Sequence, residues 1–289
     1  MSHEVYQMKE PSSEKLSFKL LYITQSEYDK GWHSTSHTHH FTELFYIVKG
    51  KGAFILPDKE VPVQENDLVI INPNTEHTER SNEKDSLEYI ALGIEGVSFS
   101  LPDETSAHKT SGTTIGLYTY REERQDVFFY LNRLLEEVQQ SQEAFDIICQ
   151  NIIEILIIKL RRGKKFTIQK TTSKNMNKAV AFAKHFINQN FRDPLTLDSL
   201  AEIAHINKYH LAHTFKHDIG LSPIEYLINV RIREAKILLE TTDYTIGDIA
   251  VLNGFSSQSF FTQAFKRETH YTPSQYRKAT QNKANATSH

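Results

Sequence analysis

Cysteine and long apolar runs are nearly absent from this sequence. The one cysteine among 289 residues, Cys149, has no partner for an internal disulfide, and its apolar helical surroundings favour a core role over a catalytic one. The most apolar stretch, residues 152–160, is interrupted by Glu154 and Lys159, and no run of 18 apolar residues occurs. These absences exclude a disulfide scaffold and a transmembrane helix.

The first residues also lack the pattern of an export signal. Residues 1–15 are polar, whereas a signal peptide has a basic start followed by an apolar segment. We therefore expect a protein of the cytoplasm. The composition, 39% hydrophobic and 24% charged, is that of a globular protein, and 289 residues suffice for two domains of ordinary size.

The chain has no excess of positive charge, since its net charge is −3, but the charges are unevenly distributed along it. Residues 174–289 hold 14 Lys and Arg against 10 Asp and Glu, a balance of +4. Residues 1–173 hold 19 Lys and Arg against 26 Asp and Glu, a balance of −7. This contrast suits a nucleic-acid-binding domain joined to an acidic partner domain.

Short strands dominate the first hundred residues. The segments rich in β-branched and aromatic residues are 18–23, 43–48, 52–56 and 87–94. Turn signals separate them at residues 50–52 (Gly-Lys-Gly), 57–58 (Pro-Asp) and 72–74 (Asn-Pro-Asn). Many short strands at this spacing predict a β-barrel or a sandwich.

The hydrophobic period becomes helical after residue 120. Residues 121–140 and 145–160 each place apolar side chains along one helical face. These are Val127, Leu131, Leu134, Leu135 and Val138 in the first segment and Ile148, Ile152, Ile155, Leu156 and Leu160 in the second. We expect an antiparallel pair, residues 121–162, that packs on the barrel or forms a dimer contact with a second subunit. The polar, basic residues 163–177 are typical of a linker.

Two stretches of the C-terminal third, residues 195–226 and 244–276, repeat the same pattern. Thr196 and Ala201 match Thr245 and Ala250 at an offset of 49. Phe215, Lys216, Pro223 and Tyr226 match Phe265, Lys266, Pro273 and Tyr276 at an offset of 50. The change of offset predicts one extra residue in the turn of the second copy. A repeated helix, short turn and helix predicts two helix-turn-helix units.

The second helix of each unit has an apolar and a polar face. Leu211 and Phe215, like Phe261 and Phe265, are spaced to point inward. The opposite faces carry Tyr209, His213 and Lys216 in the first unit and Ser259, Gln263, Lys266 and Arg267 in the second. A polar stripe is by default a solvated face, but repetition of the whole unit favours contact with bases and phosphates. Asn207, Gly254 and Ser256 suit the turns and N-caps between the helices.

The C-terminal region resembles a known family. Residues 180–279 are similar to the DNA-binding domain of the AraC/XylS family of bacterial regulators. The motifs are Gly220-Leu-Ser-Pro223, Arg231-Ile-Arg-Glu-Ala235 with Leu238-Leu239, Ile249-Ala250, Gly254-Phe255, Phe260-Phe261, Phe265-Lys266 and Thr272-Pro-Ser-Gln-Tyr276-Arg277. The resemblance implies an all-α domain of seven helices over residues 178–281, with residues 223–239 as a long joining helix, and double-stranded DNA and RNA polymerase as partners. His270 stands where the first unit has Gly220, which predicts a strained left-handed helix end.

Residues 1–120 carry a second resemblance. Gly31, His37, His39, Glu43 and Gly50 have the spacing of the first cupin motif. Residues 66–77 resemble the second motif and keep its histidine, His77. Asn66 and Asn74 replace its glycines and Asn72 its proline, and asparagine tolerates the same turn conformations. We therefore expect a cupin-like β-barrel, which in many AraC-type regulators is the effector pocket.

Four of these residues form the candidate effector-binding site. His37 and His39 alternate in a predicted strand, so both should face the barrel interior, where Glu43 and His77 join them. Three imidazoles and one carboxylate can hold Fe, Mn, Ni or Zn. The same groups can instead line a polar pocket that binds a ligand without metal. The family resemblance favours this second interpretation, in which no cofactor is required. We expect His33 and His40 to be exposed or to lie in turns.

Together the two resemblances predict a two-domain α+β protein and its function. We expect a sequence-specific transcription regulator, an activator of a catabolic operon that acts as a homodimer and responds to a small-molecule effector. A sugar is the effector class that the resemblance implies. Effector binding would shift the population of DNA-binding arrangements. The alternative is a metal-dependent cupin enzyme, an isomerase or dioxygenase, fused to a DNA-binding domain; that fusion argues against catalysis, so we expect no enzyme.

Overall fold

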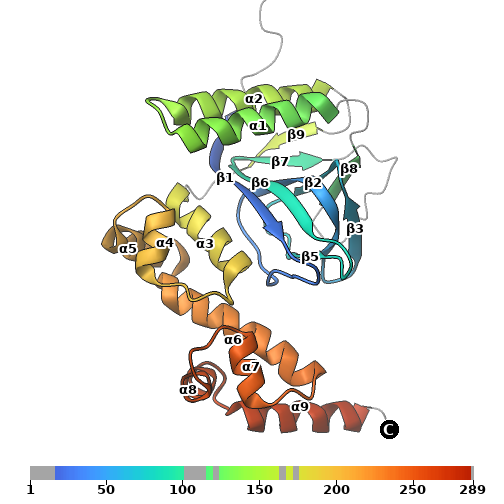
Figure 1. Cartoon of the computed structure of the whole chain (residues 1–289), viewed down its shortest axis with the longest axis vertical. Helices are drawn as coiled ribbons and strands as arrows, with labels where there is room; N and C mark the ends of the chain where they lie inside the picture. The colour runs from blue at the N-terminus through green and yellow to red at the C-terminus, as the bar shows by residue number, and fades with distance from the viewer. Residues whose placement is uncertain (1–16, 101–114, 120–123, 163–166, 172–175, 288–289) are drawn as a thin grey trace, which may run out of the picture.

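A strand-rich domain, a helical pair and a helical domain follow one another along the chain (Figure 1). The structure is a computed structural model that describes residues 17–100, 115–119, 124–162, 167–171 and 176–287. The helical pair lies above the strand-rich domain in Figure 1, and the C-terminal helices lie beside and below it. The predicted two-domain α+β class is confirmed. Within the described ranges, no helix is both long and apolar enough to cross a membrane.

The N-terminal domain is antiparallel throughout. Its strands are β1 (Lys19–Tyr28), β2 (Thr42–Ile55), β3 (Glu60–Gln64), β4 (Asp67–Ile71), β5 (Thr78–Ser81), β6 (Leu87–Glu95), β7 (Val97–Ser100) and β8 (Ile115–Thr119). The main sheet has the order β1-β6-β2-β4-β8, and β3 and β5 pair with the second half of β2. The long strand β2 therefore joins the two layers of the domain.

The predicted turn at residues 50–52 is wrong, because β2 runs through it. Gly50 has a φ of 86°, and the register of β2 against β6 shifts between Ile47 and Lys49. A Cβ added at Gly50 would lie 1.8 Å from the Ser86 carbonyl oxygen, so only glycine fits there. The Gly-Lys-Gly motif bends a strand between two layers instead of reversing the chain.

Alternate residues of the central strands build two cores on opposite sides of the main sheet. Leu44 and Leu92 face the helical pair, where they pack in one cluster with Leu131 and Ile153. The neighbouring side chains, including Phe45 and its contacts Phe54 and Tyr89, fill the interior of the barrel. The candidate site lies among the strands that enclose this second core.

The helical pair consists of α1 (Arg124–Gln140) and α2 (Phe145–Arg162), and it packs on the barrel. The buried face of α2 differs from the predicted one, since Ile148 and Ile155 are 41% and 44% exposed. Its buried residues are Cys149, Ile153, Leu156, Ile157 and Leu160. Because α2 is apolar nearly all round, periodicity alone could not select the face that meets the barrel.

The predicted linker contains a strand. Within residues 163–177, β9 (Thr167–Lys170) pairs with β7 in antiparallel fashion, with Phe99 opposite Ile168. The chain therefore returns to the barrel before it enters the C-terminal domain. Ile168 is the one apolar residue in this short strand, so the sequence gave little strand signal there.

The C-terminal domain contains two helix-turn-helix units. Its helices are α3 (Lys178–Asn190), α4 (Leu197–Ile203), α5 (Lys208–Ile219), α6 (Pro223–Thr241), α7 (Ile246–Leu252), α8 (Gln258–Thr269) and α9 (Pro273–Thr287). The pairs α4–α5 and α7–α8 form the two units, and each unit has its own apolar core. The joining helix α6 ends two residues beyond the predicted residue 239 and contributes to both cores.

The turns of the two units differ by one residue, as the change of offset predicts. They span residues 204–207 and 253–257. Asn207 caps α5 by accepting a hydrogen bond from the Tyr209 amide, while Ser257, not the predicted Ser256, caps α8. The helix end at His270 is left-handed, with a φ of 64°, as predicted.

Candidate DNA-binding face and buried polar cluster

Helices α5 and α8 hold corresponding positions in the two units and divide their faces in the same way. Leu211 and Phe215 of α5, like Phe261 and Phe265 of α8, are fully buried. All seven residues predicted to contact DNA are exposed on the opposite faces: Tyr209, His213, Lys216, Ser259, Gln263, Lys266 and Arg267. Their side chains are accessible to a duplex that approaches these two helices.

Two accessible side chains at the starts of these helices escaped the sequence prediction. His210 of α5 and Gln258 of α8 are exposed in the first turn. The N-terminal residues of a recognition helix are the ones that reach base edges in known helix-turn-helix complexes. The only sequence signal for them was their place just after the N-caps. Lys208 is also in the first turn, but its Nζ lies 2.7 Å from Asp198 Oδ1.

Helix α6 sets the separation of the two units. Its 19 residues span about 28 Å at 1.5 Å per residue, close to the ~34 Å between successive major-groove faces. Ser222 and Glu225 form a capping box at its start. In its middle, Arg231 donates 2.7 Å hydrogen bonds to the carbonyls of Phe191 and Asp193, which ties α6 to the end of α3.

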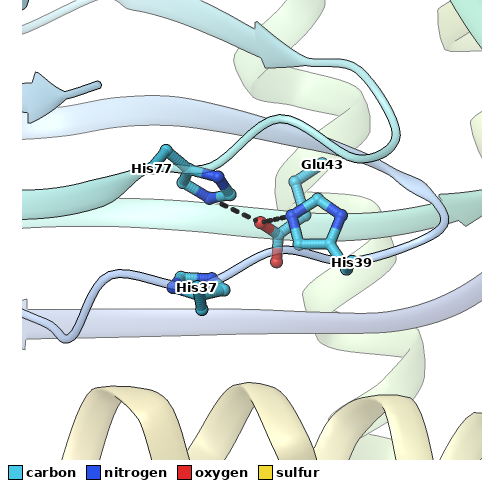
Figure 2. Close-up of side chains that lie close together, drawn as sticks. All are labelled: His37, His39, Glu43 and His77. Atoms are coloured by element: carbon cyan, nitrogen blue, oxygen red, sulfur yellow. Dashed lines mark hydrogen bonds and ion pairs between the residues drawn. The ribbon is translucent and has the colours of Figure 1, made fainter. Parts of the chain in front are cut away.

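A buried polar cluster in the N-terminal domain unites the four predicted effector-binding residues (Figure 2). One ligand atom from each of His37, His39, Glu43 and His77 lies within 4.8 Å of the others. Each of the four residues is at most 6% exposed. The structure thus brings together groups that are up to 40 positions apart in the sequence.

The backbone around the cluster is less regular than predicted. His37 and His39 lie in an extended segment before β2, not in a continuous strand. His37 forms an isolated bridge with His77, in which the His37 amide donates to the His77 carbonyl at 2.9 Å and the reverse bond measures 3.1 Å. Glu43 is the second residue of β2, and His77 directly precedes β5. These two hydrogen bonds hold the segment of His37 and His39 against the segment of His77.

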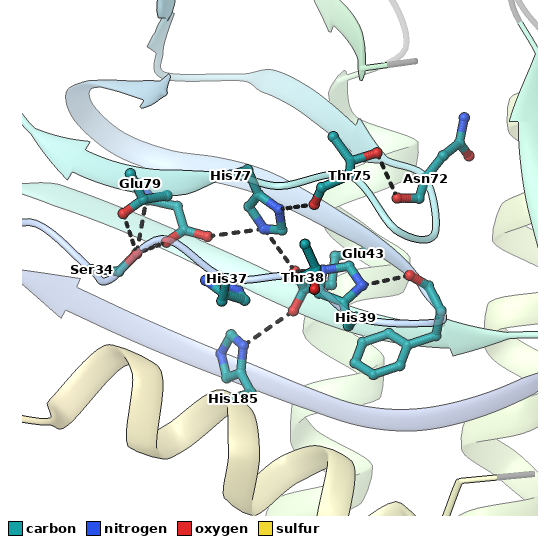
Figure 3. A network of polar contacts seen from close by, with 12 residues as sticks. Ser34, His37, Thr38, His39, Glu43, Asn72, Thr75, His77, Glu79 and His185 are labelled. Atoms are coloured by element: carbon teal, nitrogen blue, oxygen red, sulfur yellow. Dashed lines mark hydrogen bonds and ion pairs between the residues drawn. The ribbon is translucent and has the colours of Figure 1, made fainter. Parts of the chain in front are cut away.

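Each histidine of the cluster has its Nδ1 atom held by a backbone carbonyl. The bonds run from His37 to Thr35, from His39 to Phe41 and from His77 to Thr75, at 2.8, 2.6 and 2.9 Å. Figure 3 shows the bond between His77 and Thr75. A carbonyl oxygen only accepts, so every Nδ1 carries the hydrogen. The three Nε2 atoms are therefore left for the interior of the cluster.

Glu43 meets two of these Nε2 atoms through one oxygen. Its Oε2 lies 2.6 Å from His39 Nε2 and 3.2 Å from His77 Nε2. A neutral imidazole with its hydrogen on Nδ1 and a carboxylate are both acceptors, so this approach requires a proton or a cation between them. The Nε2 atom of His37 is buried and has no hydrogen-bond partner among the described residues.

The pKa shifts set His77 apart from the other two histidines. Burial holds the pKa of His37 well below its usual value and lowers the pKa of His39 as well, so both rings are neutral near pH 7. Burial also opposes the charged form of His77, but its hydrogen bond to Glu43 and the nearby Glu79 carboxylate raise its pKa. Despite its own burial, the pKa of Glu43 lies well below its usual value because of His39 and the other donors around it.

This donor set fits a divalent cation. Three Nε2 atoms and one carboxylate oxygen are a usual ligand set for Zn²⁺, Mn²⁺ or Fe²⁺. A carbonyl that holds the far ring nitrogen is the outer contact typical of metal-binding histidines, and all three rings have one. The unpartnered Nε2 of His37 would gain a partner, and a cation would compete with a proton for Nε2 of His77.

A second buried carboxylate, Glu79, lies beside the cluster. Its Oε1 atom is 3.6 Å from His77 Nε2 and has no hydrogen-bond partner among the described residues. Its Oε2 atom accepts hydrogen bonds from the Ser34 hydroxyl and from Gln189 Nε2. Glu79 was not predicted, because a lone glutamate in a short strand has no distinguishing spacing.

Three further histidines lie near the cluster, and only one of them, His40, lies where it was expected. His40 is exposed, as expected. His33 was expected to be exposed or to lie in a turn, but it is half-buried, forms an isolated bridge with Arg80 and contacts Arg192 of the C-terminal domain. His185 of α3 was missed altogether, and its Nδ1 lies 3.2 Å from Glu43 Oε1. In the sequence His185 is one of several polar residues of this helix, and nothing in its spacing indicates an interdomain contact.

Known families match both halves of the chain. Residues 25–93 match the model of the cupin domain, and residues 200–279 match a model of the helix-turn-helix domain. The second range contains both recognition helices and the AraC-type motifs described above. The chain thus combines a cupin domain with a helix-turn-helix domain of the AraC type.

Similar proteins cover the AraC-type chain to different extents. The bifunctional transcriptional activator/DNA repair enzyme AdaA of Bacillus subtilis is 41% identical over 92 residues, 32% of this chain and 44% of that protein. This chain thus spans less than half the length of AdaA. The uncharacterized HTH-type transcriptional regulator YdiP of Escherichia coli is 24% identical over 261 residues, 88% of this chain and 84% of its own. The C-terminal domain of AraT, a response regulator from Geobacillus stearothermophilus, is 31% identical with a TM-score of 0.35, covering 37% of this chain and 88% of that one.

Proposed function

We propose that this AraC-type chain is a sequence-specific DNA-binding transcription regulator. The proposal is carried by the repeated unit, which presents α5 and α8 with matching exposed polar faces from the two ends of α6. We assign base contacts to His213 and Gln263 and phosphate contacts to the lysines of the same helices. The name of YdiP, an HTH-type transcriptional regulator that matches 88% of this chain, supports a regulator.

The finer features of this function come with the family resemblance. They are activation through RNA polymerase, control of a catabolic operon, a sugar as effector, and a place in the cytoplasm. No single side chain carries them. The cupin barrel is the proposed sensor, because it holds a cluster of buried ionisable groups in which the Nε2 atom of His37 has no hydrogen-bond partner among the described residues.

The DNA-binding proposal is tested by selection of genomic fragments with the full-length chain. We expect the fragments to share a motif with two contacted segments about one helical turn apart. The variant His213→Ala, Gln263→Ala is the matched control, and it should lose about 1–3 kcal/mol of discrimination per contact while it keeps binding to random DNA. Lys266→Ala should instead reduce the salt dependence of binding. Enrichment without any shared motif would contradict the proposal.

We further propose that the four-residue cluster binds a divalent cation as part of sensing. The support is that ligand atoms of three buried histidines and Glu43 lie within 4.8 Å of one another. The same set would serve a metal-dependent isomerase or dioxygenase, which is the alternative function. Metal analysis of the purified chain, combined with a search for turnover of candidate sugars, separates a metal-loaded sensor from an enzyme. His77→Ala should lose the cation and the effector response of a reporter but retain DNA binding.

The helical pair supports a homodimer. Beyond the face that packs on the barrel, α1 and α2 expose several large apolar side chains, with Phe129 57%, Ile147 60% and Ile155 44% exposed. We propose that a second copy covers them. Sedimentation of the Ile147→Glu, Ile155→Glu variant tests this contact, and an unchanged dimer would place the contact elsewhere.

A further inference from the structure

Helix α3 carries two buried side chains toward the two buried carboxylates of the barrel. His185 and Gln189 are one helical turn apart and are 5% and 4% exposed. His185 Nδ1 lies 3.2 Å from Glu43, and Gln189 Nε2 donates to Glu79 at 3.2 Å. Figure 3 shows His185 reaching from α3 to the cluster. The C-terminal domain thus contributes to the interior of the sensor.

The two oxygens of Glu43 serve different partners. Oε2 faces His39 and His77, whereas Oε1 accepts hydrogen bonds from the Tyr22 hydroxyl and His185. The rings of Tyr22 and His185 also lie against each other, with centroids 4.8 Å apart. A cation bound through Oε2 would leave these Oε1 contacts in place. His185 therefore lies outside the ligand set, where it fixes the orientation of the ligating carboxylate.

The histidine-bearing segment, residues 33–39, is bonded to the C-terminal domain as well. The Thr35 hydroxyl donates to Glu234 of α6 at 2.6 Å and accepts from Arg233 at 2.8 Å. The carbonyl of the same Thr35 holds the Nδ1 atom of His37. One residue after His37, the Thr38 carbonyl accepts from Lys184 of α3 at 2.7 Å. Helix α6, which separates the two recognition helices, thus contacts the residue whose carbonyl holds a ligand of the cluster.

From these contacts we propose that His185 is a positioning residue for the cation site, and that cation binding and docking of α3 and α6 on the barrel strengthen each other. The proposal rests on the proposed cation-binding role of the cluster. Because coupling between two sites is reciprocal, removal of the α3 contact must weaken cation binding, and the cation must stabilise the docked domain. The sensor and the DNA-binding domain are then connected through His185 and Thr35, without a separate relay element.

Zinc titration of the full-length chain against a chromophoric chelator tests the first half. We expect His185→Leu to bind Zn²⁺ about 10–100-fold more weakly than the parent chain, the usual effect of losing an outer contact to a metal ligand. His185→Asn can keep a donor close to the Nδ1 position and should restore most of the affinity. His217→Ala removes a histidine that is 78% exposed on α5, and it should bind zinc like the parent chain.

Amide hydrogen exchange of the same samples tests the second half. Zn²⁺ should slow exchange in residues 178–190 and 223–241 of the parent chain, but not in His77→Ala or His185→Leu. Equal zinc affinity in parent and His185→Leu, or zinc protection confined to the barrel, would overturn the coupling. A parent chain that binds no zinc would overturn both the cation site and the coupling. Sequence-specific DNA binding is measured separately. None of these zinc results bears on it, so the regulator proposal is tested independently of the cation site.

Discussion

His33 illustrates how a single protonation can act on the contact between the two domains. Its Nδ1 donates to the Ser34 carbonyl at 3.0 Å, so its Nε2 accepts the hydrogen bond from Arg192 at 2.5 Å. Burial and then the Arg192 guanidinium lower the pKa of His33, with Arg80 acting in the same direction and Glu234 against it. A protonated His33 could not accept from Arg192 and would face its positive charge.

The lowered pKa gives a signed prediction for stability. Since the pKa of His33 in the folded chain lies below the unfolded value of 6.5, its contribution is fully present above pH 6.5 and is lost as the pH falls through the folded pKa. The loss can reach about 1.4 kcal/mol per pH unit. We expect the parent chain to lose more stability than His33→Asn between pH 7.5 and pH 5.5.

The one tryptophan of the chain reports on this contact. Trp32 precedes His33 and stacks on Tyr28, with ring centroids 3.6 Å apart, beside a cavity that Arg192 also lines. Urea unfolding followed by tryptophan fluorescence therefore measures the region around His33. Identical pH dependence of the urea midpoint in parent and His33→Asn would contradict the assignment.

At the scale of elements, two glycines with the same left-handed backbone conformation differ in the space that their surroundings leave for a side chain. Gly220 and Gly254 have φ values of 87° and 75°. A Cβ at Gly220 would meet nothing within 4 Å, whereas a Cβ at Gly254 would lie 2.3 Å from the Arg192 carbonyl oxygen. In the second unit, His270 occupies the position that Gly220 has in the first. A residue with a side chain can therefore adopt this left-handed conformation.

This difference predicts unequal effects of alanine. Gly220→Ala should cost about 1 kcal/mol, the price of a left-handed conformation alone. Gly254→Ala adds a backbone clash between the turn of the second unit and the end of α3, and should cost about 3 kcal/mol. Thermal or urea unfolding of the two variants measures both values. Equal destabilisation would mean that the close approach of Gly254 to Arg192 does not exist in solution.

Most helices and the four cluster residues could be predicted from the sequence, because helical periodicity and motif spacing are local properties. The continuity of β2 could not, since Gly50 gives the same local signal in a bend as in a turn. The buried face of α2 was predicted only in part, with Leu156 and Leu160 right and Ile148 and Ile155 wrong, because a helix that is apolar nearly all round has no preferred side. His185 and Glu79 acquire their roles only when α3 docks on the barrel, and that contact joins residues more than 100 positions apart.

At the scale of the whole molecule, the domains keep separate cores and share a smaller one. The two helix-turn-helix units are built around two clusters of their own residues. The cluster that spans the domains consists mainly of Leu21, Tyr22, Phe41, Met176 and Ala181. The docked arrangement therefore depends on this small apolar contact together with the polar bonds of α3 and α6. Such an interface is weak enough to respond to binding in the barrel.

Separate cores predict that the C-terminal domain is autonomous. A fragment of residues 174–289 should fold on its own, because α6 already joins its two apolar clusters. It should bind the same DNA sequences as the full-length chain, since α5 and α8 are exposed in both. Zinc and chelators should leave its DNA affinity unchanged, whereas the full-length chain should respond to them. Circular dichroism and DNA titrations of the two proteins, with His77→Ala in the full-length chain as control, make the comparison. A fragment that unfolds would show that the docked barrel is part of the domain's core, and a fragment that still responds to zinc would place the cation site outside the barrel.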